Sequence, residues 1–495
     1  MLNTIPERYL QPLYRVESIR KREQASFAEE GESYAMMERA GQALYRHILQ
    51  HNPTIKHLSI VVGSGNNGGD GLVVASLAAK DGLTVKVYDC ATSPRNGDAK
   101  RAELEALSID EIVIEKDVSR LIADPAEVVV DALLGIGFQP PLRKNYQAAI
   151  KALNDKRALG AWVLSVDCPS GLDVNTGLMD TAVKADLVVT FIGDKLGHHL
   201  QHGAVLCHQI ITEALGAVDL PERADAYFLA SSVLDVFPPC LRVPNSHKGT
   251  YGHVTVLGGD IGYGGAAIMA SEAAAKSGAG TVSLYTQMRN LTASLARNPN
   301  IMCMAVEDSS LQSTLRSEKS VLVVGPGLGR SDWSEACWQA FLALPNYAAV
   351  VDADGLYWLG INAPTAIDKL VMTPHPGEAA RLLGCSTADV LGDLTGTAKS
   401  LAKTYTAVVV LKGATSVVAD PSGKMVIVGA PCPALSKGGS GDVLSGMVGA
   451  CLAYYQDVFE AAVIATAWHN KAALACSKKI GEVSMQPYQL LDYLE

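Results

Sequence analysis

The stretch 437–446, which reads KGGSGDVLSG, has the composition of a site for phosphate chemistry. The apolar residues that follow Asp442 recur at helical spacing, so Asp442 is expected at or near a helix N-terminus. Glycines there leave backbone N–H groups exposed, and the helix dipole adds positive potential, which suits a phosphate. A carboxylate repels phosphate, so Asp442 is better explained as a base that deprotonates an attacking hydroxyl. A plain helix N-cap with a glycine turn is the alternative.

A second glycine-rich stretch, GSGNNGGDG at 63–71, directly follows the apolar run 57–62. Its glycines satisfy GxGxxG, which permits an NAD-binding interpretation, although this pattern alone is weak. No lysine follows it, so a Walker A phosphate loop is excluded. Asn66, Asn67 and Asp70 are unusual in a loop that only approaches a pyrophosphate. Asparagine side chains offer oxygen ligands and amide donors, which suit a monovalent cation held beside a phosphate.

Two more polar, glycine-bearing loops follow apolar runs, DALLGIGF at 131–138 and VDCPSGLD at 166–173. Ligands of open α/β sheets bind outside the carboxyl ends of the strands. Each aspartate alone could be a helix cap or could form an Asx-turn. The three loops of the first half together predict one site at one sheet edge.

Histidines and a lysine in other loops each have two interpretations. Pro374 and Pro376 fix the backbone of His375, which suits a positioned imidazole but also a simple turn. Lys412 is either a surface lysine at a strand end or a contact to a nucleotide phosphate. His198, His199, His202 and His208 make a transition-metal site conceivable, but no carboxylate or cysteine pattern accompanies them, so a solvated loop is expected.

Alternating helix and strand patterns surround the motifs of the first half. Residues 33–50 have an amphipathic helical pattern, and 72–80 predicts a helix after the glycine-rich stretch. Strands are expected at 57–62, 84–88, 112–114, 128–131, 162–166 and 187–191. This alternation predicts a mostly parallel, doubly wound sheet.

The second half repeats this organisation around a second sheet. Its strands are expected at 253–257, 281–285, 321–324, 350–352, 370–372, 407–411, 416–419 and 425–428, and a helix at 267–277. Prolines break the segment between the halves, so 221–240 is expected to be a linker. The predicted organisation is α/β with two domains, 1–220 and 241–495, the first Rossmann-like with three αβα layers.

Composition limits the class of protein. The 495 residues suffice for two to four domains, and 48% hydrophobic with 19% charged residues is ordinary for a soluble globular protein. A net charge of −10 without a basic patch argues against nucleic acid as a partner. The ten scattered cysteines form no CxxC pair and are expected to be reduced. Neither a signal peptide nor a membrane-spanning run is present, so we expect a cytoplasmic protein with no membrane partner. A homo-oligomer is expected as well.

The loops of the first half resemble the NAD(P)H-hydrate epimerase domain, and so does MERAG at 37–41. The resemblance implies a potassium ion near Asn67, Asp131 and Ser170, and it makes Asp167 the proton-transfer residue. It implies nicotinamide-nucleotide contacts at Asn66, Asn67, Gly68, Gly69, Asp70, Gly135, Ile136, Gly137, Phe138, Gln139, Pro140, Pro141 and Asp167. The segment 193–199 departs from the pattern expected of this family.

The second half resembles ribokinase-like small-molecule kinases at GGSGD, 438–442, and more closely one branch of them, the NAD(P)H-hydrate dehydratases. That branch implies a ribokinase-like αβα domain with Asp442 as the catalytic base. It implies contacts to the nicotinamide nucleotide at Ala266, Gly327, His375 and Asp442. It implies adenine-nucleotide contacts at Lys412, Gly413, Ala414, Thr415, Ser416 and Gly441. The segment 430–435 replaces the Asn-Pro-Gly type of segment that this branch carries.

The two resemblances together imply a bifunctional metabolite-repair enzyme. Its substrates would be the hydrated forms of NADH and NADPH, NADHX and NADPHX. The first domain would interconvert their S and R epimers, and the second would dehydrate the S form with Mg²⁺ and ADP, releasing AMP and phosphate. ADP and ATP both remain open as the nucleotide. The alternatives are a small-molecule kinase with a regulatory first domain, and a first domain that only senses nucleotides or binds a partner.

Overall fold

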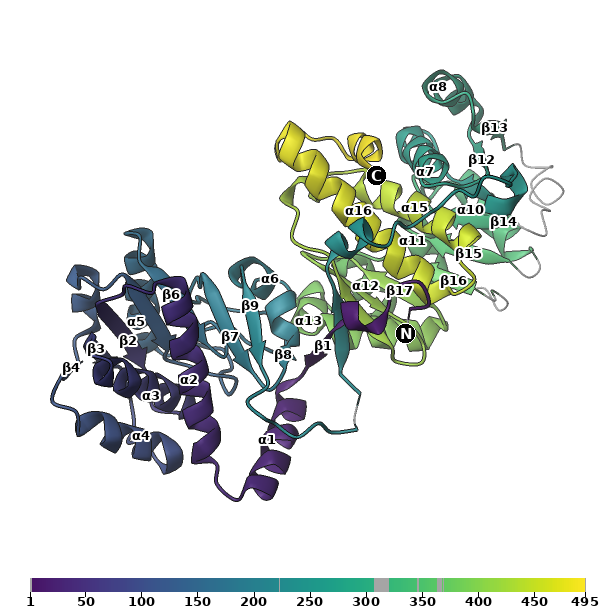
Figure 1. The fold of residues 1–495 in the computed structure, drawn as a ribbon. Helices are drawn as coiled ribbons and strands as arrows, with labels where there is room; N and C mark the ends of the chain where they lie inside the picture. The colour runs from purple at the N-terminus through teal and green to yellow at the C-terminus, as the bar shows by residue number, and fades with distance from the viewer. Residues whose placement is uncertain are drawn as a thin grey trace. The chain divides into compact units, whose positions relative to one another are not determined.

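The structure is a computed structural model that describes residues 2–221, 223–306, 320–344, 347–362, 367 and 369–494. The chain forms two compact units. The N-terminal unit is Pro12–Ala226, and the C-terminal unit combines Met1–Gln11 with Tyr227–Glu495. Each unit has a sheet that carries helices, which confirms the predicted α/β class (Figure 1). Among the described residues, no helix is long and apolar enough to cross a membrane.

The N-terminal unit is built on a seven-stranded sheet in the order β4-β3-β2-β5-β6-β7-β9. Every neighbouring pair in it is parallel. The strands are β2 (His57–Val62), β3 (Thr84–Asp89), β4 (Ile112–Glu115), β5 (Val128–Ala132), β6 (Trp162–Val166), β7 (Leu187–Phe191) and β9 (Ile210–Glu213). Their valines and isoleucines suit strands that are covered on both faces.

Helices cover both faces of this sheet (Figure 1). Alternate residues of each strand point to opposite faces and so enter different cores. Ile60 belongs to the core with α2, α3 and α4, whereas Val61 belongs to the core with α5. The helices are α1 (Val16–Glu30), α2 (Tyr34–His51), α3 (Asn66–Lys80), α4 (Gly97–Leu107), α5 (Lys144–Ala158) and α6 (Gly203–Leu206), with the 3-10 helices η2 (Val118–Ala123) and η3 (Leu196–His199). Strand β1 (Gln11–Tyr14) pairs in parallel with β8 (Asp194–Lys195).

Helix α3 begins at Asn66, six residues before the predicted start at 72. The glycines of this stretch therefore lie in the first turns of a helix and not in a loop. Gly68 has no room for a side chain, because a Cβ there would collide with the carbonyl oxygen of Gly63. Close packing of the helix start against the end of β2 explains glycines that helix propensity alone disfavours.

The C-terminal unit has a sheet in the order β13-β12-β11-β14-β15-β16-β17-β18-β19-β10. Neighbours from β13 to β17 are parallel, and β18 is antiparallel to β17 and to β19. The strands are β10 (Ala226–Leu229), β11 (His253–Leu257), β12 (Thr281–Thr286), β13 (Met302–Ala305), β14 (Ser320–Val324), β15 (Ala348–Val351), β16 (Lys369–Met372), β17 (Val408–Leu411), β18 (Ser416–Ala419) and β19 (Met425–Val428).

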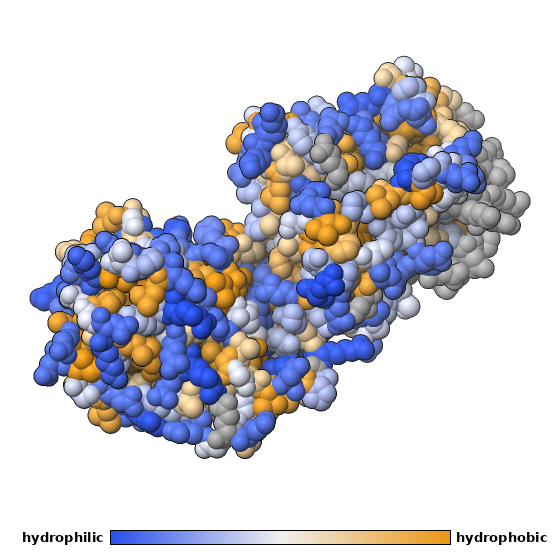
Figure 2. All heavy atoms as spheres, viewed as in Figure 1, coloured by the Kyte–Doolittle hydropathy of each residue, from blue (hydrophilic) through white to orange (hydrophobic). Residues whose placement is uncertain are grey.

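Helices α7, α15 and α16 pack against one face of this sheet. The helices of the unit are α7 (Gly264–Lys276), α8 (Leu291–Arg297), α10 (Asp332–Leu342), α11 (Asp354–Ile361), α12 (Pro376–Leu383), α13 (Thr387–Gly392), α14 (Leu394–Tyr405), α15 (Ser440–Tyr454) and α16 (Val458–Ile480). Short 3-10 helices are η1 (Glu7–Tyr9), η4 (Ser231–Asp235), η5 (Lys248–Tyr251), η6 (Met288–Asn290), η7 (Pro433–Leu435) and η8 (Pro487–Tyr493). Figure 2 shows apolar residues interspersed with hydrophilic ones over the visible face of both units.

Two boundaries differ from the prediction. Residues 1–11, expected in the first domain, belong to the C-terminal unit, where Leu2 and Ile5 enter the core. The Thr4 backbone N–H donates to Glu460 Oε1 over 2.6 Å. The expected linker 221–240 contains β10, which pairs with β19. The partners of both segments lie some 200 to 450 residues away in sequence, so local patterns do not reveal them.

Candidate active sites

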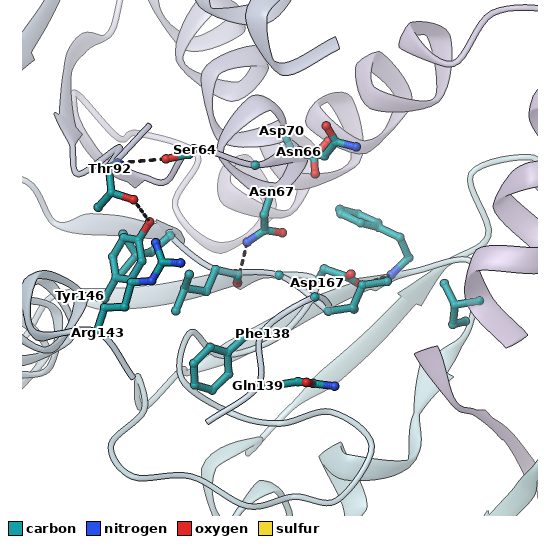
Figure 3. Close-up of a pocket in the computed structure, with 18 of the residues that line it drawn as sticks. Ser64, Asn66, Asn67, Asp70, Thr92, Phe138, Gln139, Arg143, Tyr146 and Asp167 are labelled. Carbon is teal, nitrogen blue, oxygen red and sulfur yellow. Dashed lines mark hydrogen bonds between the residues drawn. The ribbon is translucent and has the colours of Figure 1, made fainter. Parts of the chain in front are cut away.

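A cavity of about 600 Å³ lies at the carboxyl ends of β2, β5 and β6 in the N-terminal unit (Figure 3). Of the predicted residues, Asn66, Asn67, Asp70, Gly135, Ile136, Gly137, Phe138, Gln139, Pro141 and Asp167 line it. Gly68 and Gly69 are buried within α3, and Pro140 is exposed. In Figure 3, Thr92, Arg143 and Tyr146 group on one side, away from Asp70 and Asp167.

The three predicted potassium ligands come together around Leu134. Asn67 Nδ2 donates to the Leu134 carbonyl oxygen over 3.0 Å, and the Leu134 N–H donates to Ser170 Oγ over 2.9 Å. Asp131 is fully buried at the end of β5 and accepts from the Ser170 hydroxyl (2.5 Å), the Ser170 N–H (2.9 Å) and the Ser165 hydroxyl (2.7 Å). Burial raises the pKa of Asp131, although these hydrogen bonds oppose the rise.

Asp167 is held rigidly in the turn after β6. Its φ of 62° is in the left-handed region, an unusual and strained conformation for a residue with a side chain. Oδ1 accepts from Thr190 Oγ1 (3.0 Å), from the Phe191 N–H (3.0 Å) and from the Lys195 ammonium. Within the described part of the chain no donor is recorded for Oδ2, so that oxygen remains available to a ligand in the cavity.

Lys195 is a site residue that sequence reasoning missed. Its side chain is completely buried and donates to Asp167, to Thr190 Oγ1 (2.7 Å) and to the Phe191 carbonyl oxygen (3.0 Å). A buried ammonium needs such partners, because its desolvation is costly. The one signal in the sequence was its position four residues after the apolar run 187–191, at the sheet edge already predicted to hold the site.

The histidines beside Lys195 do not form the solvated loop that was expected. His198 and His199 are buried, and both contact Asp194, through Nδ1 (2.7 Å) and Nε2 (2.6 Å) respectively. Burial disfavours the Asp194 carboxylate, but the two imidazoles outweigh burial and hold its pKa well below its usual range. Among the residues the structure describes, no group of three or more His, Cys, Asp or Glu side chains is arranged so that it could hold a metal ion. The cluster is a packed polar core next to Lys195.

Helix α1 also contributes to the cavity, which the sequence analysis had not foreseen. Ile19, Arg20 and Glu23 lie on its wall. Burial and the negative charge of Asp167 raise the pKa of Glu23, although Lys195 and Arg20 oppose this. No glycine-rich or repeated motif marks α1, so only the folded chain reveals this contribution.

The second site gathers at the carboxyl ends of neighbouring parallel strands in the C-terminal unit. The loops after β11 and β14 are joined by backbone bonds, including Asp260 N–H to the Gly327 carbonyl oxygen over 2.7 Å. Gly327 has a φ of 59°, and a Cβ on it would lie 3.1 Å from the Ala266 Cβ. Ala266 and Gly327, both predicted to contact substrate, are thus adjacent.

Asp442 is the third residue of α15, as the helical spacing predicted. Gly439 caps the helix with a φ of 103°, a conformation that favours glycine. No acceptor is recorded for the N–H groups of Gly441 and Asp442 among the described residues, so they are free to bind an anion. Burial, together with the nearby Asp352 charge, raises the pKa of Asp442 to about 7, against the effect of Lys412.

Lys412, at the end of β17, lies beside this helix start. Its ammonium is 3.0 Å from Asp352 Oδ1 and 3.9 Å from Glu378 Oε2. A Cβ on Gly441 would lie 3.1 Å from the same ammonium. Burial disfavours the charged form of the Lys412 ammonium. The negative charges of Asp352 and Glu378 outweigh this effect and raise the pKa of Lys412. The structure therefore excludes the surface-lysine interpretation and adds Asp352 and Glu378 to the site.

His375 caps α12. The His375 Nδ1 accepts from the Gly377 N–H (3.0 Å), and the His375 backbone N–H donates to Glu378 Oε2 (2.8 Å). Burial and the Lys412 charge lower the pKa of His375, in keeping with a neutral ring that accepts at Nδ1. Because its side chain is still 56% exposed, the turn histidine can also contact a ligand.

The remaining predicted nucleotide contacts follow Lys412 in the turn between β17 and β18. Gly413 and Ala414 are exposed, Thr415 is buried, and Ser416 begins β18. The unusual segment 430–435 is fixed by Asn470, which donates to the Ala430 carbonyl oxygen over 2.7 Å. The structure thus brings Lys412 and Gly441 together, whereas Gly413 and Ala414 are exposed to solvent beside them.

Two family models match the chain, one for each half. The model described as YjeF-related protein N-terminus matches residues 33–197, and the model described as NAD(P)H-hydrate dehydratase matches residues 254–495. A solved ribokinase-like superfamily protein from Enterococcus faecalis aligns with a TM-score of 0.50 and 24% identity, covering 56% of this chain and 96% of that chain. This structural likeness shows a shared fold.

Curated relatives match along nearly the whole chain. The bifunctional NAD(P)H-hydrate repair enzyme of Coxiella burnetii is 36% identical over 487 residues, which is 97% of this chain and 98% of the relative. The Escherichia coli enzyme of the same name is 34% identical over 472 residues, which is 93% of this chain and 89% of the relative. The chain therefore belongs to the family of bifunctional NAD(P)H-hydrate repair enzymes.

Proposed function

We propose that this chain repairs hydrated NADH and NADPH in two steps. The N-terminal unit interconverts the S and R epimers, and the C-terminal unit dehydrates the S epimer at the expense of ADP, releasing AMP and phosphate. The observation that carries the dehydration step is Asp442, a carboxyl whose pKa burial raises to about 7, at a helix start with free N–H groups. A carboxyl titrating near neutral pH is suited to general base catalysis.

The dehydration step explains why a kinase-like site serves a lyase. Water is a poor leaving group, whereas phosphate leaves readily. Asp442 removes the proton of the ring hydroxyl, which attacks the terminal phosphoryl group of the nucleotide. The N–H groups of Gly441 and Asp442 stabilise the charge on the transferred group, and Lys412 adds a positive charge beside them. Phosphate then departs from the ring carbon with the electrons of its C–O bond, and the neighbouring carbon loses a proton, whose C–H electrons restore the nicotinamide double bond.

Nucleotide and substrate approach this centre from two sides. Lys412, Gly413, Ala414, Thr415, Ser416 and Gly441 are proposed to bind the adenine nucleotide. Ala266, Gly327 and His375 are proposed to contact the hydrated nicotinamide nucleotide. Asp352 and Glu378 would hold Mg²⁺ between them and the nucleotide phosphates, and Mg²⁺ would neutralise phosphate charge there. Asp352 Oδ2 fits this role, because it is buried and has no hydrogen-bond partner in the described part of the chain.

For the epimerase we propose Asp167 as a proton-transfer residue. Asn66–Asp70 and 135–141 are proposed to bind the substrate. The oxygen atoms of Asn67 and Ser170, with the Asp131 charge behind them, would hold K⁺, which would fix the substrate-binding loops. Homo-oligomer formation and cytoplasmic location stay predictions; the molar mass in solution tests the first, and cell fractionation tests the second.

One experiment tests the function as a whole. The purified chain is incubated with hydrated NADH and with ADP, ATP or neither, while the absorbance of reduced nicotinamide is followed. Recovery of that absorbance with stoichiometric release of phosphate is the expected result, and comparing the two nucleotides settles the preference. A stable phosphorylated product, with no recovery of NADH, would instead support the small-molecule kinase alternative.

A further inference from the structure

The cavity of the N-terminal unit holds two aspartates in opposite environments. Asp167 receives three donors on Oδ1, one of them the Lys195 ammonium. Asp70, in the second turn of α3, also lines the cavity and is only 9% exposed. No hydrogen bond or ion pair of its carboxyl is recorded among the described residues. One carboxyl is thus held by three donors, and the other is nearly buried with no recorded partner.

The charges around Asp70 favour its protonated form. Burial raises its pKa well above the ordinary value, and the negative charges of Asp167 and Glu23 raise it further. The Lys195 ammonium donates to Asp167, Thr190 and the Phe191 carbonyl, and no cation is recorded as a partner of Asp70 among the described residues. Burial and nearby negative charge both favour the protonated form of a carboxyl.

Inverting the hydrated carbon requires a proton to be removed and another to be supplied. Water adds to an enamine at the carbon next to nitrogen, so this carbon carries both the hydroxyl and the ring nitrogen. Breaking its bond to nitrogen gives an aldehyde, which can turn and close again on the other face. Opening needs a base at the hydroxyl and an acid at the nitrogen.

We propose that Asp70 is the general acid of the epimerase and acts opposite Asp167. Asp167 Oδ2 takes the hydroxyl proton, and the O–H electrons form the C=O bond. The electrons of the C–N bond pass to nitrogen, which receives the Asp70 proton. On closure nitrogen attacks the other face of the aldehyde, Asp70 recovers its proton from nitrogen, and Asp167 returns its proton to oxygen. No water or redox partner is consumed. This assignment rests on the proposed epimerase function.

The decisive variant is Asp70→Asn in the full-length chain. Epimer exchange is followed by NMR from the pure R form without nucleotide, above the spontaneous rate. The loss expected for a general acid is at least about 100-fold in kcat. Dehydration of the S form, which is assigned to the other unit, stays at the wild-type level. The Asp70→Glu variant, which restores a carboxyl, recovers part of the rate.

Glu23→Gln is the matched control. Glu23 is a second carboxyl of the same cavity, with a pKa raised by burial and by Asp167. Its side chain is on α1 and has Arg20 as a neighbouring charge, so its removal alters the local charge without removing the proposed acid. The expected loss for Glu23→Gln is far smaller than that for Asp70→Asn. An equal loss in both variants would show an effect of net charge and overturn the proposal.

Labelled water tests the bond that opens. In ¹⁸O-water, opening of the C–N bond leaves the original oxygen on the inverted product, whereas loss of the hydroxyl introduces one solvent oxygen for each inversion. Retention is expected, and stoichiometric incorporation overturns the proposed step. Wild-type exchange by Asp70→Asn, or a change confined to KM with kcat at the wild-type level, overturns the role of Asp70 as acid. Absence of exchange by the wild-type chain refutes the epimerase function itself, which is a separate outcome.

Discussion

Aspartates at four positions carry the proposals, and their hydrogen bonds distinguish them. Both carboxylate oxygens of Asp131 accept hydrogen bonds from serine side chains. Asp167 is engaged at one oxygen only among the described contacts. Asp70 and Asp442 have no donor recorded in the described residues, and Asp442 lies beside the N–H groups of a helix start. The same side chain is therefore a structural acceptor at Asp131, a proposed base at Asp167 and Asp442, and a proposed acid at Asp70.

Replacement of Asp442 tests the dehydratase base. The Asp442→Asn variant keeps the size of the side chain and cannot accept the hydroxyl proton, so kcat for dehydration should fall at least about 100-fold. Epimer exchange in the same chain is the control and should not change. Full dehydration by the variant would exclude the proposed mechanism.

The pH dependence of dehydration follows from the same residue. Because burial raises the pKa of Asp442 to about 7, the base form increases as pH rises through 7, and kcat should rise with it. Stability changes in the opposite direction. The folded chain retains a proton that the unfolded chain releases from about pH 4 upward, so the free energy of unfolding falls as pH rises towards 7.

Removing the Asp442 charge should therefore stabilise the protein in alkaline solution. At pH 8 the Asp442→Asn variant is expected to gain on the order of 1 kcal/mol in unfolding free energy, allowing for solvent screening. At pH 4 the folded carboxyl is protonated and the unfolded one is about half protonated, so most of the gain should disappear. Chemical denaturation at the two pH values measures the difference, and a gain that is larger at pH 4 would contradict the assigned sign.

The ends of β5 and β6 are joined by a network that contains the proposed potassium site. Ser170 links Asp131 to Leu134, and Asn67 on α3 binds the same Leu134 carbonyl. Among the described residues, the recorded hydrogen bond of the Ser165 hydroxyl is the one to the Asp131 carboxylate. These two serines make a matched pair, because each loses one hydroxyl bond to Asp131 but only Ser170 contacts Leu134.

The Ser170→Ala variant should lose stability and ion dependence together. Loss of its hydroxyl leaves buried groups of Asp131 and Leu134 without partners, at a cost of about 1–3 kcal/mol in unfolding free energy. Stimulation of epimer exchange by KCl relative to NaCl should also fall. Ser165→Ala should lower stability in a similar way and retain the potassium response. Loss of that response in both variants would assign it to Asp131 alone.

The strand end of β17 places Lys412 between two acidic residues and the start of α15. The Lys412→Met variant leaves Asp352 and Glu378 without their cation, which should cost about 3 kcal/mol in unfolding free energy. The KM for the nucleotide should rise, because a positive charge beside the phosphates is lost. Lys424→Met, at an exposed turn, is the control and should change neither quantity. An unchanged nucleotide KM in Lys412→Met would exclude Lys412 from nucleotide binding.

At the level of the whole molecule, each unit contains one complete candidate site. The cavity is lined by residues of Pro12–Ala226 alone, and the surroundings of Asp442 come from Tyr227–Glu495 alone. Neither site takes a residue from the other unit among the contacts described. Two full-length chains, each with one damaged site, should therefore supply each other's activity.

A mixing experiment measures this independence. The Asp167→Asn and Asp442→Asn chains are each incubated with R-NADHX and ADP, alone and together. Recovery of NADH is expected at the spontaneous-epimerisation rate for Asp167→Asn, at background for Asp442→Asn, and near the wild-type rate for the mixture. A mixture no faster than the Asp167→Asn chain would show that the R form must be processed within one chain.

Much of this organisation could be predicted from the sequence. Parallel strands that are buried on both faces read as continuous apolar runs, so β2, β5, β6 and β7 were located within a residue or two. Glycines and aspartates directly after such runs identify the sheet edge that binds ligands. The position of Asp442 in the first turn of α15 followed from helical spacing in the same way.

The environment of each side chain could not be predicted, because it depends on contacts between distant segments. Lys195 reads as an ordinary lysine until the chain folds it against Asp167, and His198 and His199 read as solvent-exposed until they meet Asp194. Helix α1 enters the cavity without any motif, and residues 1–11 find their partner in Glu460. Local pattern thus specifies strands, helix starts and ligand-binding loops, whereas burial and charge pairing arise from three-dimensional packing and set the environment of each aspartate.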